Sequence, residues 1–382
     1  MSSSKKPSII LLPPAVPGSL GDEAQVVVVV EAMKAKGYNV DIFSYKKDCK
    51  WGLGSKVSRM VDVEPHFKKD FITPKESLSK LFSKYKRFYM LGADIMDGYY
   101  SVPWSLRKIN MLKTAKEAGL KTVLLGSSFN HAPNPKIIKS LSELPKTVRL
   151  CARDPVSYKR CKKFLPKNNF DLVADVAFQL KPKFIEIESH IKKEKQKGRH
   201  VIGININWLI ASNIGISFDK LASIYAEFMN KLCKKDFSFV LLPHDFRKTK
   251  KSISDVEFTD IVLSKLDDET RQYCFRPKLP YSAAQIKYIV KRLDFVVSGR
   301  MHLAIACLGQ GVPVACIVYQ GKFEGLFGFF GLKKLLMDPK SLLKKDSLLK
   351  QFEKLFPKRR MIKKKILTNL PKVMKYSRKN FI

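Results

Sequence analysis

Short apolar runs alternate with helix-like segments along most of this 382-residue chain, and this alternation limits the folds it can adopt. In the first half, each apolar run is separated from the next by a helical stretch or a turn-rich loop. A strand, a helix and a second strand in succession are typical of a parallel sheet with crossover helices. The expected strands are 9–12, 38–45, 88–91, 122–126 and 149–152, with a helix at 104–118.

The second half repeats this pattern after a charged, weakly apolar segment at residues 182–199, which is typical of a linker or an exposed helix. Two such halves predict an α/β fold with two Rossmann-like lobes and a central cleft. We expect an N-terminal lobe at 1–181, a C-terminal lobe at 182–340 and a basic helical tail at 341–382. The expected strands of the second half are 201–206, 237–242, 295–298 and 314–318, and its helices are 218–234, 283–291 and 303–308.

One segment gives conflicting signals. Residues 26–30 are five consecutive valines, which favour a strand by propensity. Their surroundings favour a helix over residues 23–36, because Asp22 is a suitable N-cap and Gly37 a suitable stop. The sequence therefore predicts a buried helix here.

Basic residues are in large excess: 72 Lys and Arg against 34 Asp and Glu, a formal net charge of +38. Such a charge attracts nucleic acids, anionic membranes and anionic substrates. Lysines are spread over nearly the whole chain and far outnumber the arginines that base recognition uses, so no specific nucleic-acid partner is expected. The densest basic block, residues 357–382, is expected to be a solvated helix face. Weak association of this tail with an anionic membrane is the alternative left open.

The sequence lacks the usual signals for membrane insertion, export and metal binding. No run approaches the roughly 18 apolar residues of a spanning helix, and the run at 9–12 ends in two prolines, too early for a signal peptide. Seven cysteines occur without a CxxC pair, which argues against a disulfide framework and a zinc ribbon. We expect a soluble, cytoplasmic protein with no metal and no cofactor.

A glycine-containing loop follows the first expected strand. Gly18 and Gly21 let the backbone approach a ligand closely, and the helix that opens near Asp22 favours an anion or polar group at its N-terminus. The spacing is neither GxGxxG nor a Walker A loop. A plain strand-to-helix turn is the alternative.

Carboxylates and tyrosines crowd the end of the strand at 88–91. Asp94 and Asp97 lie in the segment 92–101 together with Tyr99 and Tyr100. Such a group can bind sugar hydroxyls or act as a general base. A cluster of turn and capping residues is the alternative.

Arg153 and Asp154 follow the strand at 149–152. Asp154 before Pro155 predicts a helix N-cap with proline at the first helical position. Arg153 would then lie at the mouth of the cleft, where it could bind an anion. A surface arginine paired with Asp154 is the alternative.

The segment 298–302, Ser-Gly-Arg-Met-His, is the most informative of the loops after strands. Arg300 and His302 would place two potential cations at a helix N-terminus, which suits phosphate or carboxylate. His302 can also donate or accept a proton near neutral pH, and a buried structural histidine is the alternative. His244 follows the strand at 237–242, and Lys322 follows the last strand, as weaker candidates of the same kind.

Together these motifs resemble the polysaccharide pyruvyl transferases. The resemblance covers about residues 8–338 and rests on the order of the motifs and their placement after strands. Ser19 stands where the family more usually has Asn, and the lysine-rich tail after about residue 340 is not covered. The motifs are Gly18-Ser-Leu-Gly-Asp22, Gly92-Ala-Asp94, Ala152-Arg-Asp-Pro-Val-Ser157, Ala174-Asp175, Pro243-His-Asp245, Arg300-Met-His302 and Tyr319-Gln-Gly-Lys322.

The resemblance implies a fold similar to the GT-B glycosyltransferases, with phosphoenolpyruvate as donor and a pyruvate ketal on a saccharide as product. The N-terminal lobe would face the acceptor and the C-terminal lobe the donor. Arg153, Arg300 and His302 match the family's phosphoenolpyruvate-binding positions. His302 would be the acid or a phosphate ligand, with both arginines as anion clamps, while Asp94 or Asp97 would hold or deprotonate the acceptor. The remaining donor-site candidates are Gly18, Gly21, Asp22, His244 and Lys322.

The sequence is also compatible with two other functions. A sugar-nucleotide-dependent glycosyltransferase could share the same two lobes, although the sequence shows no metal-binding DxD motif. A basic binding protein without enzymatic activity could use the tail as its anchor, and its polyanion binding would weaken steeply with salt.

Overall fold

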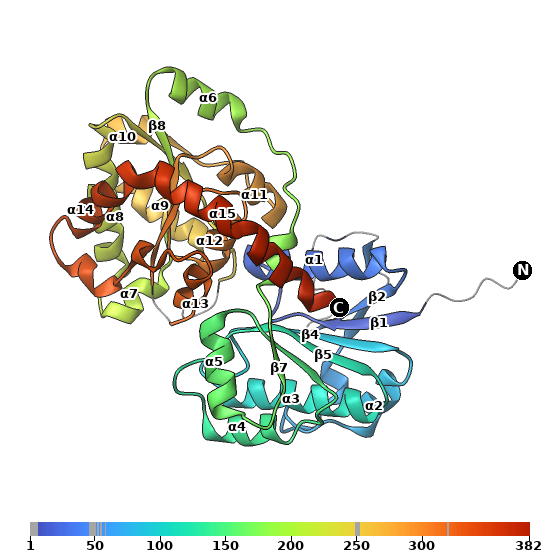
Figure 1. Ribbon diagram of the computed structural model, residues 1–382. Helices are drawn as coiled ribbons and strands as arrows, with labels where there is room; N and C mark the ends of the chain where they lie inside the picture. The colour runs from blue at the N-terminus through green and yellow to red at the C-terminus, as the bar shows by residue number, and fades with distance from the viewer. Residues whose placement is uncertain are drawn as a thin grey trace, which may run out of the picture. The chain divides into compact units, whose positions relative to one another are not determined.

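The computed structural model describes residues 7–45, 51, 53, 56–57, 59–248, 253–318 and 321–382. The chain forms two compact units, each built around its own parallel sheet (Figure 1). The first unit consists of Met1–Pro17, Asp22–Gln179 and Val373–Ile382, and the second of Gly18–Gly21 and Leu180–Lys372. The predicted α/β class with two Rossmann-like lobes is confirmed.

The first unit contains seven parallel strands in the order β3-β2-β1-β4-β5-β6-β7. β1 pairs with both β2 and β4, so the strand order reverses there. In open parallel sheets, ligands bind beyond the carboxyl ends of the strands at such a reversal. The strands are β1 (Ser8–Leu12), β2 (Asn39–Ser44), β3 (Arg59–Asp62), β4 (Arg87–Ala93), β5 (Lys121–Ser127), β6 (Arg149–Ala152) and β7 (Phe170–Leu172).

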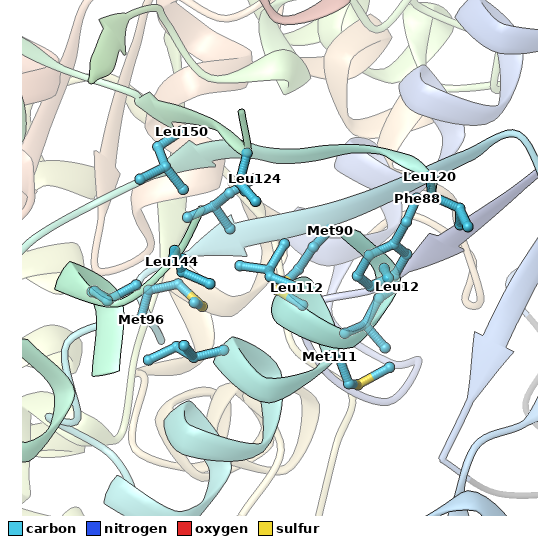
Figure 2. Close-up of a cluster of buried hydrophobic side chains, with 14 of the residues drawn as sticks. Leu12, Phe88, Met90, Met96, Met111, Leu112, Leu120, Leu124, Leu144 and Leu150 are labelled. Atoms are coloured by element: carbon cyan, nitrogen blue, oxygen red, sulfur yellow. The ribbon is translucent and has the colours of Figure 1, made fainter. Parts of the chain in front are cut away.

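The core of this unit lies between the sheet and its helices. Figure 2 shows strand residues such as Leu12, Phe88 and Met90 beside Met111 and Leu112 of α3, all of them fully buried. Burying such a side chain contributes about 1.5–3 kcal/mol, so this cluster fixes α3 on the sheet. The helices are α1 (Leu20–Ala35), α2 (Glu76–Phe82), α3 (Val102–Glu117), α4 (Pro135–Ser142) and α5 (Pro155–Phe164).

The second unit has a six-stranded parallel sheet in the order β10-β9-β8-β11-β12-β13. Here β8 pairs with β9 on one side and β11 on the other, which makes the second reversal of strand order. The strands are β8 (His200–Asn205), β9 (Phe237–Leu241), β10 (Cys274–Phe275), β11 (Phe295–Ser298), β12 (Val314–Ile317) and β13 (Leu336–Met337). The helices are α6 (Glu188–Gln196), α7 (Leu209–Ile214), α8 (Phe218–Cys233), α9 (Asp255–Ser264), α10 (Asp268–Gln272), α11 (Ala283–Val290), α12 (Met301–Leu308), α13 (Phe323–Gly328), α14 (Ser347–Leu355) and α15 (Arg359–Arg378).

The valine-rich segment is helical, as its flanking residues predict. α1 contains all five valines, and Gly37 follows its end with a φ of +83°, the left-handed conformation of a helix stop. The helix begins at Leu20, however. Asp22 therefore lies in the first turn rather than at the N-cap, and that prediction is wrong.

The segment at 182–199 is more firmly packed than the predicted linker or exposed helix. It contains α6, in which Ile191 and Glu194 are buried. The Glu194 carboxylate accepts a hydrogen bond from Ser238 of β9 at 2.8 Å. Lys195 forms an ion pair with Asp294. This segment is an integral part of the second unit.

The basic C-terminal segment is not a solvated helix face. In α15, Ile362, Ile366 and Val373 are buried, and the last ten residues belong to the first unit. The Ser377 hydroxyl donates to the Asp175 carbonyl, and the Asn380 amide donates to the Ala174 carbonyl, both at 2.8 Å. Its lysines cover the outside of a helix whose inner face is packed. In the described part of the chain, no helix is long and apolar enough to cross a membrane.

Candidate functional site

Polar side chains gather at the carboxyl ends of β8, β9 and β11 in the second unit. This is the edge of the sheet at which the strand order reverses. Asn205 ends β8, His244 and Asp245 follow β9, and Arg300 follows β11. The site therefore lies where a doubly wound sheet binds its ligands.

Asp255, the first residue of α9, holds these loops together. Its carboxylate is fully buried and forms a forked pair with Arg300, at 3.2 Å to Nε and 2.6 Å to Nη2. Such bidentate pairs fix the arginine geometrically. The same carboxylate accepts hydrogen bonds from the backbone N–H groups of His244 and Asp245 and from the Asn205 amide, at 3.0, 3.1 and 3.2 Å. The sequence signals only the Ser254–Glu257 capping box beside it, so the role of Asp255 was missed.

A second carboxylate, Asp245, lies between two arginines. Arg247 donates to both of its oxygens, at 2.9 and 2.7 Å, and Arg300 Nη1 is 3.4 Å away. Burial alone would raise the pKa of Asp245, but the Arg247 hydrogen bonds and the Arg300 charge outweigh it and leave the pKa below its ordinary value. Arg300 is thus already held by two carboxylates.

His244 is a buried imidazole with no protein partner in the described residues. It is 4% exposed, and neither Nδ1 nor Nε2 has a hydrogen-bond partner there. Burial, and then the nearby positive charges of His302 and Arg300, lower the pKa of His244 to about 3, with Asp245 opposing. The ring is therefore neutral at neutral pH. A buried polar group without a partner costs about 1–3 kcal/mol, which a bound ligand or water would offset.

His302 lies in the first turn of α12, whose N-cap is Arg300. Gly21 approaches it closely: a Cβ added to Gly21 would lie 2.3 Å from His302 Nδ1. Real Cβ atoms do not come so near, so only glycine fits at position 21 without moving the imidazole. The close backbone approach at Gly21 is therefore to His302, and the predicted approach to a ligand stays a prediction.

The rest of the glycine loop is bound to the loop after β9. The Leu20 N–H donates to the His244 carbonyl at 3.0 Å, and the Phe246 N–H donates to the Gly18 carbonyl at 2.8 Å. Gly18 has a φ of +119°, and a Cβ there would lie 2.6 Å from Arg247 Cγ. Both glycines of this motif are therefore required by the packing around the site.

Lys322 and Asp22 are the other donor-site candidates. Lys322 precedes α13 on the carboxyl side of β12 and is half-buried. Its motif neighbours Tyr319 and Gln320 lie outside the described residues. Asp22 belongs to the first unit, where it acts electrostatically on Lys108.

Arg153 forms a buried ion pair in the first unit. Its guanidinium donates to Asp175 at 2.9 Å and to the Ser128 hydroxyl at 2.7 Å, and both charged side chains are 3% exposed. Gln25 also donates to both oxygens of the same carboxylate, at 3.2 and 3.0 Å. Asp154 instead caps α5, as predicted, so the alternative pairing of Arg153 with Asp154 is wrong.

The two predicted acceptor-side carboxylates differ in environment. Asp97 is buried and accepts hydrogen bonds from the N–H groups of Tyr99 and Asn130, at 3.1 and 2.8 Å. Burial raises its pKa despite these bonds. Asp97 therefore shapes the loop, as the turn-cluster alternative predicts. Asp94 is half-buried and accepts a hydrogen bond from the Tyr100 hydroxyl at 3.0 Å.

Within the described ranges, no group of three or more His, Cys, Asp or Glu side chains is placed to hold a metal ion. The site in the second unit is instead a mixture of two arginines, two histidines and two carboxylates. Its imidazoles and guanidinium N–H groups can bind an anion, and His302 can transfer a proton.

The sequence profile of the family described as polysaccharide pyruvyl transferase matches residues 20–321, which is most of the chain. A search with the sequence of this chain found no match among curated proteins.

Several solved structures share the fold at very low sequence identity. A Listeria monocytogenes protein described as a UDP-N-acetylglucosamine 2-epimerase has a TM-score of 0.61 at 9% identity, covering 96% of this chain and 92% of its own. S. aureus MnaA in complex with UDP gives 0.61 at 10% identity, with the same coverage. An α,α-trehalose 6-phosphate synthase from Burkholderia multivorans gives 0.57 at 8% identity, covering 99% and 97%. These similarities show the fold, which is that of GT-B glycosyltransferases and related epimerases.

Proposed function

Because the chain belongs to the polysaccharide pyruvyl transferase family, we propose that it transfers the enolpyruvyl group of phosphoenolpyruvate to a saccharide, forming a pyruvate ketal and releasing phosphate. The observation that carries this proposal is the cluster of Arg300, His302 and His244 at the reversal of strand order in the second unit. Phosphoenolpyruvate carries a carboxylate and a phosphate, and both need N–H donors in a partly enclosed site.

The electrostatics of the cluster favour an anionic ligand. Burial is the largest cause of the lowered pKa of His244, and the electrostatic influence of His302 and Arg300 acts in the same direction, against protonation of the ring. A bound anion would accept a hydrogen bond from the N–H of this neutral ring. His302 also lies in the first turn of α12, where the helix dipole attracts negative charge. Lys322 is proposed as a further cation on the same side of the sheet.

The proposed chemistry begins with a proton. Protonation of the phosphoenolpyruvate methylene carbon turns it into a methyl group and leaves a cationic, oxocarbenium-like carbon beside it. One sugar hydroxyl attacks that carbon and releases its proton. The C–O bond to phosphate then breaks and phosphate leaves with the electron pair. A second hydroxyl attacks the resulting oxocarbenium carbon and releases its proton, which closes the ketal; one of the two released protons restores the acid and the other ends on phosphate. We assign the proton donation to His302 and the holding of the donor's anionic groups to Arg300.

Arg153 and Asp94 have supporting roles in this proposal. Arg153 can serve as an anion clamp only by exchanging part of its pairing with Asp175 for the donor, because its guanidinium is buried in that pair. Asp94 is the better of the two carboxylates for holding an acceptor hydroxyl, since Asp97 is used by its own loop.

Calorimetry with the full-length protein tests the donor. Phosphoenolpyruvate is titrated in parallel with UDP, UDP-glucose and random-sequence DNA, at low and high salt. The proposal expects saturable binding of phosphoenolpyruvate at both salt concentrations. Saturable binding of UDP or UDP-glucose without phosphoenolpyruvate binding would overturn it in favour of a sugar-nucleotide enzyme. DNA binding that disappears at high salt, with no small-molecule binding, would indicate a non-specific polyanion binder.

The acceptor and product are tested by mass spectrometry. Galactosides, mannosides and hexosamines are incubated with enzyme and phosphoenolpyruvate, and the products are searched for the added pyruvate ketal and for released phosphate. Phosphate release without any sugar product would contradict the proposed transfer.

A further inference from the structure

A pocket of about 490 Å³ lies in the first unit, at the carboxyl ends of β1, β2 and β4 beside the start of α3. Its volume is within the range of about 300–1,000 Å³ that is usual for small-molecule sites. Four aromatic side chains line it, together with one lysine and one glutamate: Tyr45, Phe71, Tyr100, Trp104, Lys108 and Glu64. No step of the donor chemistry uses these residues.

The aromatic side chains that line the pocket pack on one another and on a buried arginine. Trp104 packs edge-to-face on Phe71 and Tyr45, with ring centroids 4.5 and 5.2 Å apart. Arg107, which is fully buried, lies 3.9 Å from the Phe71 centroid and forms an ion pair with Glu64 at 3.1 Å. Trp104, Phe71 and Glu64 are thus each held by contacts within the first unit.

One wall residue has a strained backbone. Phe71 has a φ of +65°, a left-handed conformation that is costly for a bulky side chain. Trp104 and Tyr100 remain 39% and 51% exposed. Backbone strain and exposed aromatic surface both reduce the stability of the fold. Both are therefore typical of binding sites, where the exposed rings contact a ligand.

A lysine lies at the base of the pocket. Lys108 is 3% exposed, and its ammonium group donates to the Pro14 carbonyl. Burial lowers the pKa of Lys108 to about 7 against the attraction of Asp22 and Asp94. Near neutral pH this amine is therefore both a hydrogen-bond donor and, in part, an acceptor.

The polar groups of the pocket suit a ligand that carries hydroxyl groups. Glu64 lines the pocket, and the hydroxyl of Tyr100 is bound to the carboxylate of Asp94. Carboxylates accept hydrogen bonds from hydroxyl groups, and the Lys108 amine adds N–H donors beside them. Flat aromatic faces suit the C–H face of a pyranose ring, whose hydrogens are slightly positive against the negative face of the aromatic ring.

We propose that this pocket binds one pyranose ring of the saccharide acceptor, with the ring packed against Trp104 and its hydroxyls directed to Glu64, Tyr100 and Lys108. The inference rests on the proposed transferase function for the identity of the ligand, and on the pocket itself for its location. It makes Trp104 a binding residue for the acceptor and not for the donor.

Saturation-transfer NMR with methyl galactoside, methyl mannoside and methyl N-acetylglucosaminide, without donor, tests the pocket. At least one glycoside should receive saturation on its ring protons from the wild-type protein. Trp104→Ala should weaken that binding about tenfold or more, through the loss of ring stacking, while Trp104→Phe should retain most of it. Phe184→Ala removes an aromatic ring that is 59% exposed in the second unit and should change nothing.

Calorimetry of phosphoenolpyruvate on the same variants separates the two proposals. Trp104→Ala should bind the donor within about twofold of wild type, which shows that the second unit is folded, while glycoside binding by Trp104→Phe shows that the pocket in the first unit tolerates substitution at this position. Glycoside binding that is equal in wild type and Trp104→Ala, or absent from wild type, would overturn the pocket assignment. If the wild-type protein binds a glycoside but not phosphoenolpyruvate, the proposed donor is wrong and the proposed sugar pocket still holds.

Discussion

The Arg300 side chain is held in one orientation by two carboxylates of the protein. Its fork is bound by Asp255 and its remaining nitrogen faces Asp245, so its orientation is set by the protein. Arg300→Lys keeps the charge but loses the planar fork. We expect phosphoenolpyruvate to bind about 10- to 150-fold more weakly, the equivalent of one charge-assisted hydrogen bond of about 1.5–3 kcal/mol. Calorimetry measures this. An unchanged dissociation constant would remove Arg300 from the donor site.

Substitution of His302 should lower turnover rather than donor affinity. His302→Gln keeps some hydrogen bonding but cannot give up a proton, so we expect turnover to fall by about 10²–10⁴ with little change in donor binding. Steady-state rates and donor calorimetry together measure both effects. A variant that binds phosphoenolpyruvate poorly, yet turns over normally at saturation, would make His302 a phosphate ligand instead of the acid.

Lys108 links a single pKa to the stability of the whole fold. Its pKa is about 7 in the folded protein and ordinarily 10.5, so between these values the unfolded chain binds more protons than the folded one. The free energy of unfolding therefore rises with pH across that window, by about 1.6 kcal/mol from pH 7 to 8.5. In Lys108→Met this rise should be absent. Urea unfolding of both proteins at pH 6.5, 7.5 and 8.5 measures it, and equal pH slopes would contradict the burial-based explanation.

The residues that the sequence did not reveal are those defined by distant partners. Asp255 and Lys108 have ordinary neighbours in the sequence, and only the fold places one beside Arg300 and the other in an aromatic pocket. Arg153 was predicted as a candidate from its position after a strand. Its actual partner, Asp175, is 22 positions away and could not be chosen from the sequence over the adjacent Asp154.

At the scale of elements, α12 and the glycine loop depend on one another. A methyl group on Gly21 would overlap His302, so Gly21→Ala should displace the imidazole. Overpacking of this kind costs about 1–3 kcal/mol, and we expect turnover to fall at least about tenfold because His302 leaves its proton-transfer position. Gly328→Ala is the matched control, since its nearest contact would be an ordinary 3.6 Å. Full activity in Gly21→Ala would show that the His302 position is not critical.

Central strands were predictable and edge strands were not. β6 and β11 have the bounds that their apolar runs predict, because both are buried and continuous. β7, β10 and β13 have only three, two and two residues, which is too short to show any periodicity. The helix α1 was predictable in spite of its valines because its first turn and its stop are marked by suitable residues.

At the scale of the molecule, the chain ends by returning to the unit in which it began. Residues 373–382 complete the first unit rather than forming an appendage. The basic composition of the tail predicts a solvated helix face, because composition reports the exposed lysines and not the few buried contacts. Truncation after Lys365 would remove Ile366 and Val373 from a packed face, so we expect it to destabilise the protein and not merely to shorten it.

Asn380 tests this directly with a single substitution. Its side chain is buried, accepts a hydrogen bond from the Gly126 N–H at 3.1 Å and donates to the carbonyls of Ala174 and Ser377. Asn380→Ala leaves backbone groups of the first unit buried without their partners, at a cost of about 1–3 kcal/mol each. The free energy of unfolding should fall by at least about 2 kcal/mol in urea titrations. Asn369→Ala, which removes an exposed amide bonded within its own helix, should stay within about 0.5 kcal/mol of wild type. Equal stability of the two variants would show that the end of the chain does not stabilise the first unit.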